Sequence, residues 1–287
     1  MKFKVLAVIP ARLGSTRLPN KVLLKESGKY LIQHVYEQVQ KAKLIDRIIV
    51  ATDSEEVVKA CEEFGAECMM TSPDHQSGTD RIAEVVQRLS VISYQPSAKD
   101  QKFRQPTADS RRPLYDIVIN IQGDEPEINP EHIDLLAEGR WHKRFMPSKK
   151  GSRYDMKSDY VLPVATLAER ISFAEACYSQ VVKVVFNKYK EALYFSRSVI
   201  PHPRSSVKKK NPVEFYRHIG IYAYKSDFLR QFVRLEQSPM EIAEGLEQLR
   251  ILHHGYGIHV ETVESGSARG IDTREDYDEF LEREKNE

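Results

Sequence analysis

Short hydrophobic runs alternate with amphipathic segments along most of the chain. A compact apolar run at residues 5–9 predicts a buried strand, residues 47–51 a second buried strand, residues 66–70 a short strand and residues 116–121 a central strand. Apolar positions at helical spacing predict helices at residues 31–42, 80–89 and 130–138, and Ser54 is typical of the start of another. Strands and helices that alternate at this spacing indicate an α/β fold with a largely parallel sheet covered on both faces.

The same pattern returns in the C-terminal half. Further strands are predicted at residues 161–167, 181–186, 215–224 and 256–263, with one long helix at 239–253 and a last helix at 273–284. Two polar stretches without periodicity, at about 93–113 and 141–159, predict surface insertions. With 287 residues, the chain is predicted to form a single domain that carries these two insertions.

The charge balance and the N-terminus exclude several classes of protein. Lysine and arginine number 43 and aspartate and glutamate 42, so the formal net charge is +1 and we expect no nucleic-acid partner. The first apolar run is interrupted by Pro10 and Arg12 and is too short for a signal peptide or a membrane span. The three cysteines lack a metal-binding spacing and are typical of reduced thiols, so the protein is predicted to be cytoplasmic.

Candidate chemistry lies in the loops after the strands, because ligands of such sheets bind outside the carboxyl ends. The loop after the first strand combines small residues with cations, namely Gly14, Ser15, Arg12, Arg17 and Lys21. This composition fits a cradle for a phosphate chain, and equally a basic surface turn. The loop has neither a Walker A nor a Gly-x-Gly-x-x-Gly pattern, which removes the main support for a P-loop ATPase or a dehydrogenase.

Two acidic residues could hold a metal ion. Asp124 comes directly after the predicted strand at 116–121, where a carboxylate is costly to desolvate unless it is paired or binds a cation. Asp272 precedes the last predicted helix. Each could instead be an ordinary helix cap. If the two converge, a divalent cation would neutralise the pair, although their spacing in the sequence does not show convergence.

Several polar residues stand inside otherwise apolar segments. Arg197 follows an apolar pair, and Glu247 and Gln248 lie within a predicted helix. His218 and Tyr222 share one face of a predicted strand, because side chains alternate along a strand. Taken singly, a histidine in such a place is more often a hydrogen-bonded structural residue than a ligand, and the helical pair fits a solvated face.

Eight ordered blocks resemble the 3-deoxy-manno-octulosonate (Kdo) cytidylyltransferases, also called CMP-Kdo synthetases. The blocks lie at residues 9–21, 51–53, 71–81, 120–126, 192–198, 218–224, 246–250 and 270–276. Four of them contain the motifs Ile-Pro-Ala-Arg, Asp-His-Gln-Ser-Gly-Thr-Asp-Arg, Gln-Gly-Asp-Glu-Pro and Gly-Ile-Asp-Thr-Arg. Only the two insertions and a basic linker at 205–212 fall outside the resemblance. The chain is thereby identified as a member of this family.

The resemblance implies a Rossmann-like, three-layer nucleotidyltransferase fold with a mixed, largely parallel sheet and a smaller part that pairs two subunits into a homodimer. It implies transfer of CMP from CTP to Kdo, with release of pyrophosphate, for lipopolysaccharide biosynthesis. By position, the nucleotide-binding residues are Arg12, Ser15, Lys21, Ser72, Gln76, Gly78 and Arg81. The sugar-binding residues are Gln122, Arg197, His218, Tyr222, Glu247 and Gln248. Asp124 and Asp272 are the metal ligands and, with Lys21, the catalytic residues.

In the mechanism that we infer from this resemblance, the anomeric 2-hydroxyl of the sugar attacks the α-phosphate of CTP in line with departing pyrophosphate. One magnesium ion on the two aspartates would position and ionise that hydroxyl. A second ion on the triphosphate, with Arg12 and Lys21, would offset the charge of the leaving group. Arg197 would bind the Kdo carboxylate, and the remaining sugar-binding residues would bind its hydroxyls.

Three positions depart from the family pattern. Asn20 replaces a glycine and tolerates a left-handed backbone better than most residues, Tyr30 replaces a proline, and Gly245 stands where serine is common beside the sugar site. The last departure leaves open an 8-amino Kdo analogue or a nonulosonic acid as the substrate. A non-catalytic nucleotide-binding protein on the same fold would have lost a metal aspartate or a phosphate-binding cation, and all of these are present.

Overall fold

The computed structural model of the chain describes residues 3–15, 17–92, 113–139, 141, 162–203, 213–264 and 270–286. The predicted insertions at 93–113 and 141–159 therefore lie almost wholly outside the described residues. The chain divides into two compact units. The first contains residues 1–137, 224–233 and 267–287, and the second contains residues 138–223 and 234–266.

Four parallel strands form the sheet of the first unit. β1 (Val5–Pro10) pairs with β2 (Arg47–Thr52) on one side and β4 (Ile117–Asn120) on the other, and β2 pairs with β3 (Cys68–Met70). β1 and β4 are buried almost throughout, as their uninterrupted apolar runs predict. Because the strands are parallel, their carboxyl ends and the loops that follow them meet at one edge.

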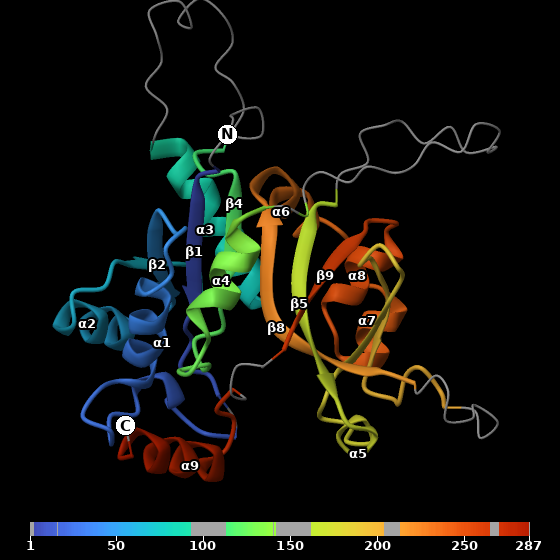
Figure 1. Cartoon of the computed structure of the whole chain (residues 1–287). Helices are drawn as coiled ribbons and strands as arrows, with labels where there is room; N and C mark the ends of the chain where they lie inside the picture. The colour runs from blue at the N-terminus through green and yellow to red at the C-terminus, as the bar shows by residue number, and fades with distance from the viewer. Residues whose placement is uncertain are drawn as a thin grey trace, which may run out of the picture. The chain divides into compact units, whose positions relative to one another are not determined.

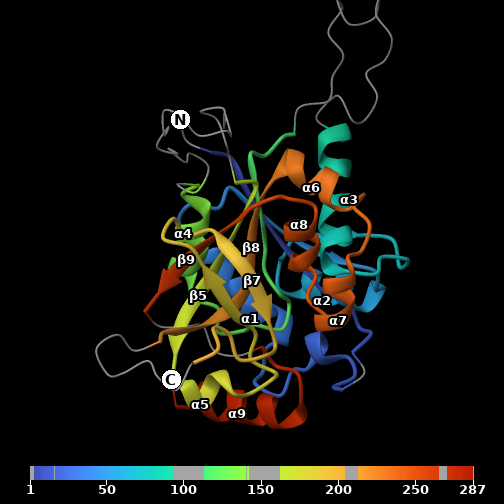
Figure 2. The ribbon, with the colours of Figure 1, turned by 90° about the vertical axis from the view of Figure 1, so that its right-hand side faces the viewer.

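Helices cover both faces of this sheet. They are α1 (Leu31–Gln40), α2 (Glu55–Glu63), α3 (Gly78–Ile92), α4 (Pro130–Ala137) and α6 (Ser226–Phe232). Figures 1 and 2 show α4 and α3 on opposite sides of the strands. The predicted helices are confirmed with ends within a few residues, and Ser54 caps α2 by accepting from the Glu56 amide. The sequence did not predict α6.

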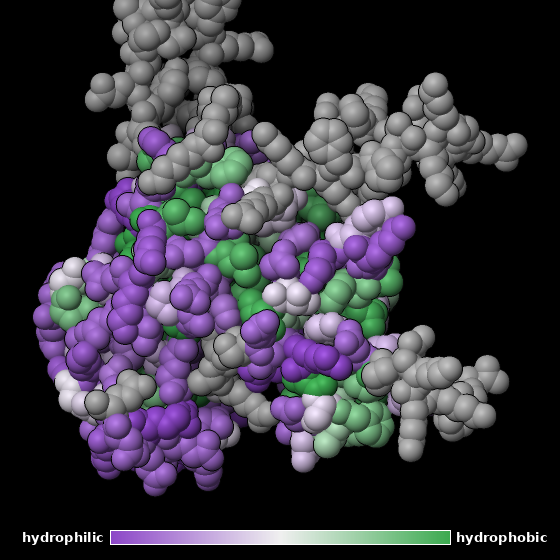
Figure 3. Space-filling view, viewed as in Figure 1, coloured by the Kyte–Doolittle hydropathy of each residue, from purple (hydrophilic) through white to green (hydrophobic). Residues whose placement is uncertain are grey.

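The C-terminal helix α9 (Arg274–Glu284) packs beside the loop that follows β1 (Figure 1). Its buried face contributes Tyr277 and Phe280 to a cluster with Leu18 and Leu31. The outer face of α9 is hydrophilic, as Figure 3 shows. This docking brings the last segment of the chain next to the first loop, which is the loop predicted to bind phosphate.

The second unit contains parallel and antiparallel strands. β5 (Val164–Ile171) pairs in parallel with β9 (Ile258–Val263), whereas β6 (Lys183–Phe186) pairs antiparallel with β7 (Ala192–Ser196) and β8 (Phe215–Lys225). The predicted mixed, largely parallel arrangement is confirmed. β7 and the short helix α5 (Phe173–Ala176) were not predicted. Within the described ranges, no helix is both long and apolar enough to cross a bilayer.

The prediction of one long helix over residues 239–253 is wrong. Two helices occupy this stretch, α7 (Pro239–Glu244) and α8 (Gln248–His253). Gly245 ends α7 in a left-handed conformation with φ 62°, and its amide donates to the carbonyl of Glu241. A left-handed residue cannot continue a right-handed helix, and glycine adopts it without a Cβ penalty. Apolar residues continue at helical spacing across this break, so the sequence pattern did not indicate where the first helix ends.

Candidate active site

Two backbone segments approach the end of β1 at close range. A Cβ at Gly123 would lie 2.7 Å from the carbonyl oxygen of Pro10, and a Cβ at Gly78 would lie 3.3 Å from the Pro10 ring. The loop after β4 can therefore come this close to Pro10 only with glycine at position 123, whereas a side chain at position 78 would require the Pro10 ring to shift slightly. This close approach forms the floor of a pocket in the first unit.

We expect Gly123→Ala to destabilise the protein by about 1–3 kcal/mol, because the clash is with backbone and not with a flexible side chain. Denaturant unfolding measures this change. Gly14→Ala is the matched control, since a Cβ at Gly14 would have no neighbour within 4 Å. Equal stability of the two variants would contradict the close approach of Gly123 to Pro10.

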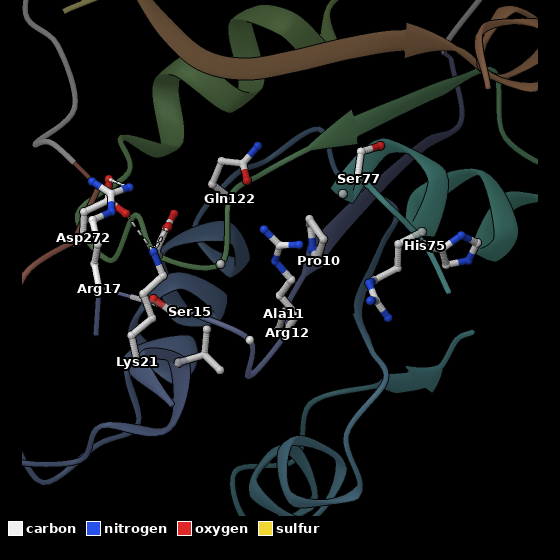
Figure 4. A pocket seen from close by; sticks show the side chains of 16 residues that line it. Pro10, Ala11, Arg12, Ser15, Arg17, Lys21, His75, Ser77, Gln122 and Asp272 are labelled. Atoms are coloured by element: carbon white, nitrogen blue, oxygen red, sulfur yellow. Dashed lines mark hydrogen bonds and ion pairs between the residues drawn. The ribbon is translucent and has the colours of Figure 1, made fainter. Parts of the chain in front are cut away.

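The pocket is lined from three loops and from the segment before α9. Its lining residues are Pro10, Ala11, Arg12, Gly14, Ser15, Arg17, Lys21, Val22, His75, Ser77, Gly78, Arg81, Gln122, Gly123, Asp124 and Asp272. Figure 4 shows Asp272, Arg17 and Lys21 gathered at one end, His75 and Ser77 at the other, and Arg12 between them. A row of cations along an open pocket suits a polyphosphate chain.

Lys21 joins the two predicted metal ligands. Its Nζ donates to Asp124 Oδ2, to Asp272 Oδ1 at 3.1 Å and to the carbonyl of Ile271 at 3.1 Å. Arg17 pairs with the other oxygen of Asp272 at 2.9 Å. Burial works against the charge of Lys21, but the two aspartates outweigh it, and the pKa of Lys21 is raised. The convergence that the sequence could not show is therefore present.

Neither aspartate caps a helix. Thr273 caps α9, with its side chain accepting from the Asp276 amide, so the side chain of the preceding Asp272 is free to turn toward Lys21. The amide of Ile271 donates to the carbonyl of Asp124 at 2.8 Å, which fixes the two acidic segments side by side. The alternative interpretation of both residues as ordinary caps is thus wrong for this structure.

The donor set fits a magnesium ion. Asp124 and Asp272 come from two different loops and both contact one cation, the Lys21 ammonium. Carboxylate oxygens are ligands that magnesium prefers, so the same two side chains could hold a magnesium ion. Among the described residues there is no group of three acidic, histidine or cysteine side chains that could hold a metal by themselves. Magnesium commonly binds one or two carboxylates and completes its shell with water and substrate phosphates, which matches a two-aspartate site.

Asn20 sets the position of Lys21. It adopts φ 54°, and its carbonyl accepts from the Leu23 amide at 2.8 Å, which closes the turn that starts with Lys21. The predicted tolerance of Asn20 for a left-handed backbone is confirmed. Tyr30, the second departure, lies on the surface, where its hydroxyl donates to Glu63 at 3.0 Å, and it does not line the pocket.

The loop between β3 and α3 is held by buried Arg81 and by half-buried Glu84. Arg81 is 3% exposed and donates to Thr71 Oγ1 and, at 2.7 Å, to Asp53 Oδ2. Glu84 accepts from the Ser72 amide at 2.9 Å and pairs with His75 Nε2 at 2.5 Å. Burial opposes the charge of Glu84, but these partners outweigh it, and the pKa of Glu84 is lowered.

Not every predicted nucleotide-binding residue reaches the pocket wall. Gly78 and Arg81 line it, whereas Ser72 and Gln76 lie in the same loop with side chains bonded to Asp74, through its Oδ2 and its carbonyl respectively. The pocket also contains His75, to which the sequence analysis assigns no role. Its place within the Asp-His-Gln-Ser-Gly motif was the signal that could have identified it. Ser77 was likewise not predicted, whereas Arg17 was predicted only as one of the cations of the first loop.

The predicted sugar-binding residues other than Gln122 belong to the second unit. His218 contacts Tyr222 on the same face of β8, with ring centroids 5.2 Å apart, as strand alternation predicts. Its Nε2 is 2.9 Å from Thr166 Oγ1. Burial lowers the pKa of His218 to about 3. The imidazole ring is therefore neutral at physiological pH, with one nitrogen that can donate a hydrogen bond and one that can accept.

Glu247 and Gln248 begin α8, directly after the break at Gly245. Gln248 is buried and Glu247 half-buried, so neither lies on the fully solvated helix face that their composition suggested. Arg197 follows β7, and its Nε donates to the carbonyl of Glu244, at the end of α7, at 2.8 Å. The helix break therefore places Arg197 close to the turn that carries the other two residues.

The chain is similar to known proteins over most of its length. A family described as cytidylyltransferase matches residues 6–262. A 3-deoxy-manno-octulosonate cytidylyltransferase of Francisella tularensis subsp. novicida is 45% identical over 274 residues, or 94% of each chain. One from Escherichia coli is 40% identical over 270 residues, which cover 94% of this chain and 92% of that protein. A solved structure of CMP:2-keto-3-deoxy-manno-octonic acid synthetase complexed with CTP is 38% identical, covers 99% of both chains and superposes with a TM-score of 0.79.

Proposed function

Because the chain belongs to the 3-deoxy-manno-octulosonate cytidylyltransferase family, we propose that it transfers CMP from CTP to the anomeric 2-hydroxyl of Kdo and releases pyrophosphate. The observation that carries this proposal is the convergence of Asp124, Asp272 and Lys21 at one end of a cation-lined pocket. The product, CMP-Kdo, would serve lipopolysaccharide biosynthesis in the cytoplasm. The three cysteines, all free thiols, support that location.

The residues of the pocket have distinct tasks in this reaction. Arg12 and Lys21 bind the triphosphate, and Lys21 also keeps the two aspartates together before substrates arrive. Magnesium, when bound to Asp124 and Asp272, would favour ionisation of the sugar hydroxyl and neutralise charge on the phosphates. No nucleophilic serine or cysteine is needed, since the sugar hydroxyl attacks the phosphorus directly.

A test of the proposal is pyrophosphate release from CTP with a panel of sugars in the presence of magnesium. We expect turnover with Kdo to exceed that with 8-amino Kdo or a nonulosonic acid. Preference for either analogue would overturn the choice of sugar and leave the reaction class intact. Binding of CTP without turnover on any sugar would instead support a non-catalytic nucleotide-binding protein.

The conformation of Gly245 offers an explanation for this residue that does not require a modified sugar. Gly245 has φ 62° and ends α7, so its glycine is accounted for by backbone conformation. A serine there would meet no neighbour within 4 Å of its Cβ but would bear the cost of a left-handed backbone. The departure from serine therefore needs no change of substrate.

We further propose that the second unit mediates a homodimer. Among the residues that the structure describes, most of the exposed large hydrophobic ones belong to this unit, namely Phe173, Tyr178, Tyr189, Leu193 and Ile242. Figure 3 shows hydrophobic surface gathered around α5. In the part of the chain that the structure describes, β7 pairs with β6, and an antiparallel bridge between Glu191 and His259 lies just before its first residue. The proposed interface is therefore formed by exposed side chains and not by strand pairing.

Leu193→Asp is expected to shift the protein from dimer to monomer, because it places a charge on β7 where the side chain is 60% exposed. Light scattering coupled to size exclusion measures the mass. Met70→Asp is the control, since Met70 is an exposed hydrophobic residue of the first unit. An unmodified protein that is monomeric, or a Leu193→Asp variant that stays dimeric, would contradict this interface.

A further inference from the structure

Arg197 is held at its backbone and along one edge of its guanidinium. Its amide donates to Glu244 Oε2 at 2.9 Å, and its Nε donates to the Glu244 carbonyl at 2.8 Å. Nη1 lies 3.4 Å from the carbonyl of Ser179. The side chain is exposed, and within the described residues the guanidinium donates to main-chain carbonyls and not to a carboxylate. One edge of the guanidinium is thus fixed, while its charge is available to an acidic ligand.

Lys183 is a buried cation to which the proposed reaction gives no role. Its side chain is 0% exposed, and its Nζ donates to the carbonyls of Tyr178 at 3.0 Å, Val181 at 2.6 Å and Arg197 at 2.6 Å. An ammonium has three donors, so these three carbonyls satisfy it completely. Burial of a charge is costly, and an apolar residue would fill this space at lower cost unless the three carbonyls had to be held together.

The three carbonyls that Lys183 binds all belong to the surroundings of Arg197. One is the Arg197 carbonyl itself. The other two, from Tyr178 and Val181, flank Ser179, which supplies an acceptor for the guanidinium. Lys183 therefore fixes both the residue that presents the guanidinium and the turn against which that guanidinium rests.

Glu244 completes this arrangement from the end of α7. Its Oε1 accepts from Ser196 Oγ at 2.6 Å while its Oε2 accepts from the Arg197 amide. The Ser196 hydroxyl oxygen in turn accepts from the Ser198 amide at 2.9 Å. Because the carboxylate of Glu244 binds main chain and a hydroxyl, it orders the Arg197 segment without neutralising the guanidinium.

We propose that Lys183 and Glu244 are positioning residues that hold Arg197 in place to bind the carboxylate of the acidic sugar. This inference rests on the proposed function and adds two residues that act on sugar binding through Arg197. It implies a specific separation of kinetic effects, since the pocket for CTP lies in the first unit and these residues in the second.

Glu244→Gln is expected to raise the KM for Kdo about tenfold and to leave the KM for CTP unchanged, because the amide cannot accept both hydrogen bonds of the carboxylate. Lys183→Met should raise the KM for Kdo further. Glu236→Gln and Lys188→Met are the matched controls, since both residues are exposed on the same unit. If Lys183→Met does not fold, Glu244→Gln alone decides the outcome.

A double-mutant cycle with Arg197→Met separates positioning from general stability. In that background, Glu244→Gln should change the KM for Kdo less than twofold, because the group that it positions is gone. A tenfold effect that persists there, an equal rise in the KM for CTP, or an unchanged KM for Kdo would overturn the positioning role. Absence of turnover by the unmodified protein would overturn the proposed function, and the positioning role with it.

Discussion

Replacing Asp124 by asparagine should lower kcat/KM for pyrophosphate release by about a hundred- to a thousandfold. Asparagine keeps the shape of the side chain but removes the negative charge that faces Lys21 and that would bind magnesium. Asp272→Asn should have a similar effect, because its carboxylate contacts the same ammonium from the opposite segment. Initial rates measured over a range of CTP and Kdo concentrations at saturating magnesium give kcat/KM for both variants.

The control for this pair of substitutions is Asp278→Asn, which removes an exposed carboxylate from α9 without touching the pocket. It should keep nearly the full rate. Melting temperatures of all three variants establish that the fold is retained. Full activity of either Asp124→Asn or Asp272→Asn would contradict the assignment of these aspartates as metal ligands and would leave the cations of the loop as the main source of phosphate binding.

The sheet of the first unit could be predicted because its strands are short and mostly apolar. β1 and β4 are buried almost throughout and β2 over its last four residues, so hydrophobic positions dominate and the strands are easily distinguished from the polar loops. The same rule located the loops at the carboxyl ends, and with them Asp124. The elements that were missed, such as β7 and α6, are short and carry polar residues within them.

The contacts that complete the site could not be predicted, because they join segments far apart in the chain. Asp272 reaches Lys21 only because α9 docks its Tyr277 and Phe280 against the first loop. A sequence pattern records the apolar face of a helix but not the surface against which that face packs. Likewise, the sequence could not predict that Lys183 and Glu244 contact Arg197, because for Lys183 this contact depends on the pairing of β6 with β7.

Substitution of Lys21 by methionine gives the second large effect that we expect. The unmodified protein has an ammonium between Asp124 and Asp272, and the side chain of Lys21 is only 13% exposed. Without it, the Asp124 carboxylate faces that of Asp272, which keeps its ion pair with Arg17, and we expect a loss of about 1–3 kcal/mol in the free energy of unfolding without metal. The rate of pyrophosphate release should also fall about a hundredfold or more, because a phosphate-binding cation is lost.

Magnesium should rescue the stability of Lys21→Met but not its activity. In the unmodified protein the ammonium competes with a metal ion for the same oxygens, so added magnesium should raise the melting temperature more in Lys21→Met than in the unmodified protein. Lys25→Met, which removes an exposed lysine paired with Glu63, should respond to magnesium as the unmodified protein does. An equal response of all three proteins would place the magnesium site elsewhere. If magnesium raises the melting temperature of Lys21→Met more than that of the unmodified protein, and the double variant Lys21→Met/Asp124→Asn loses this extra rise, the metal binds to this carboxylate pair. This measurement does not depend on turnover.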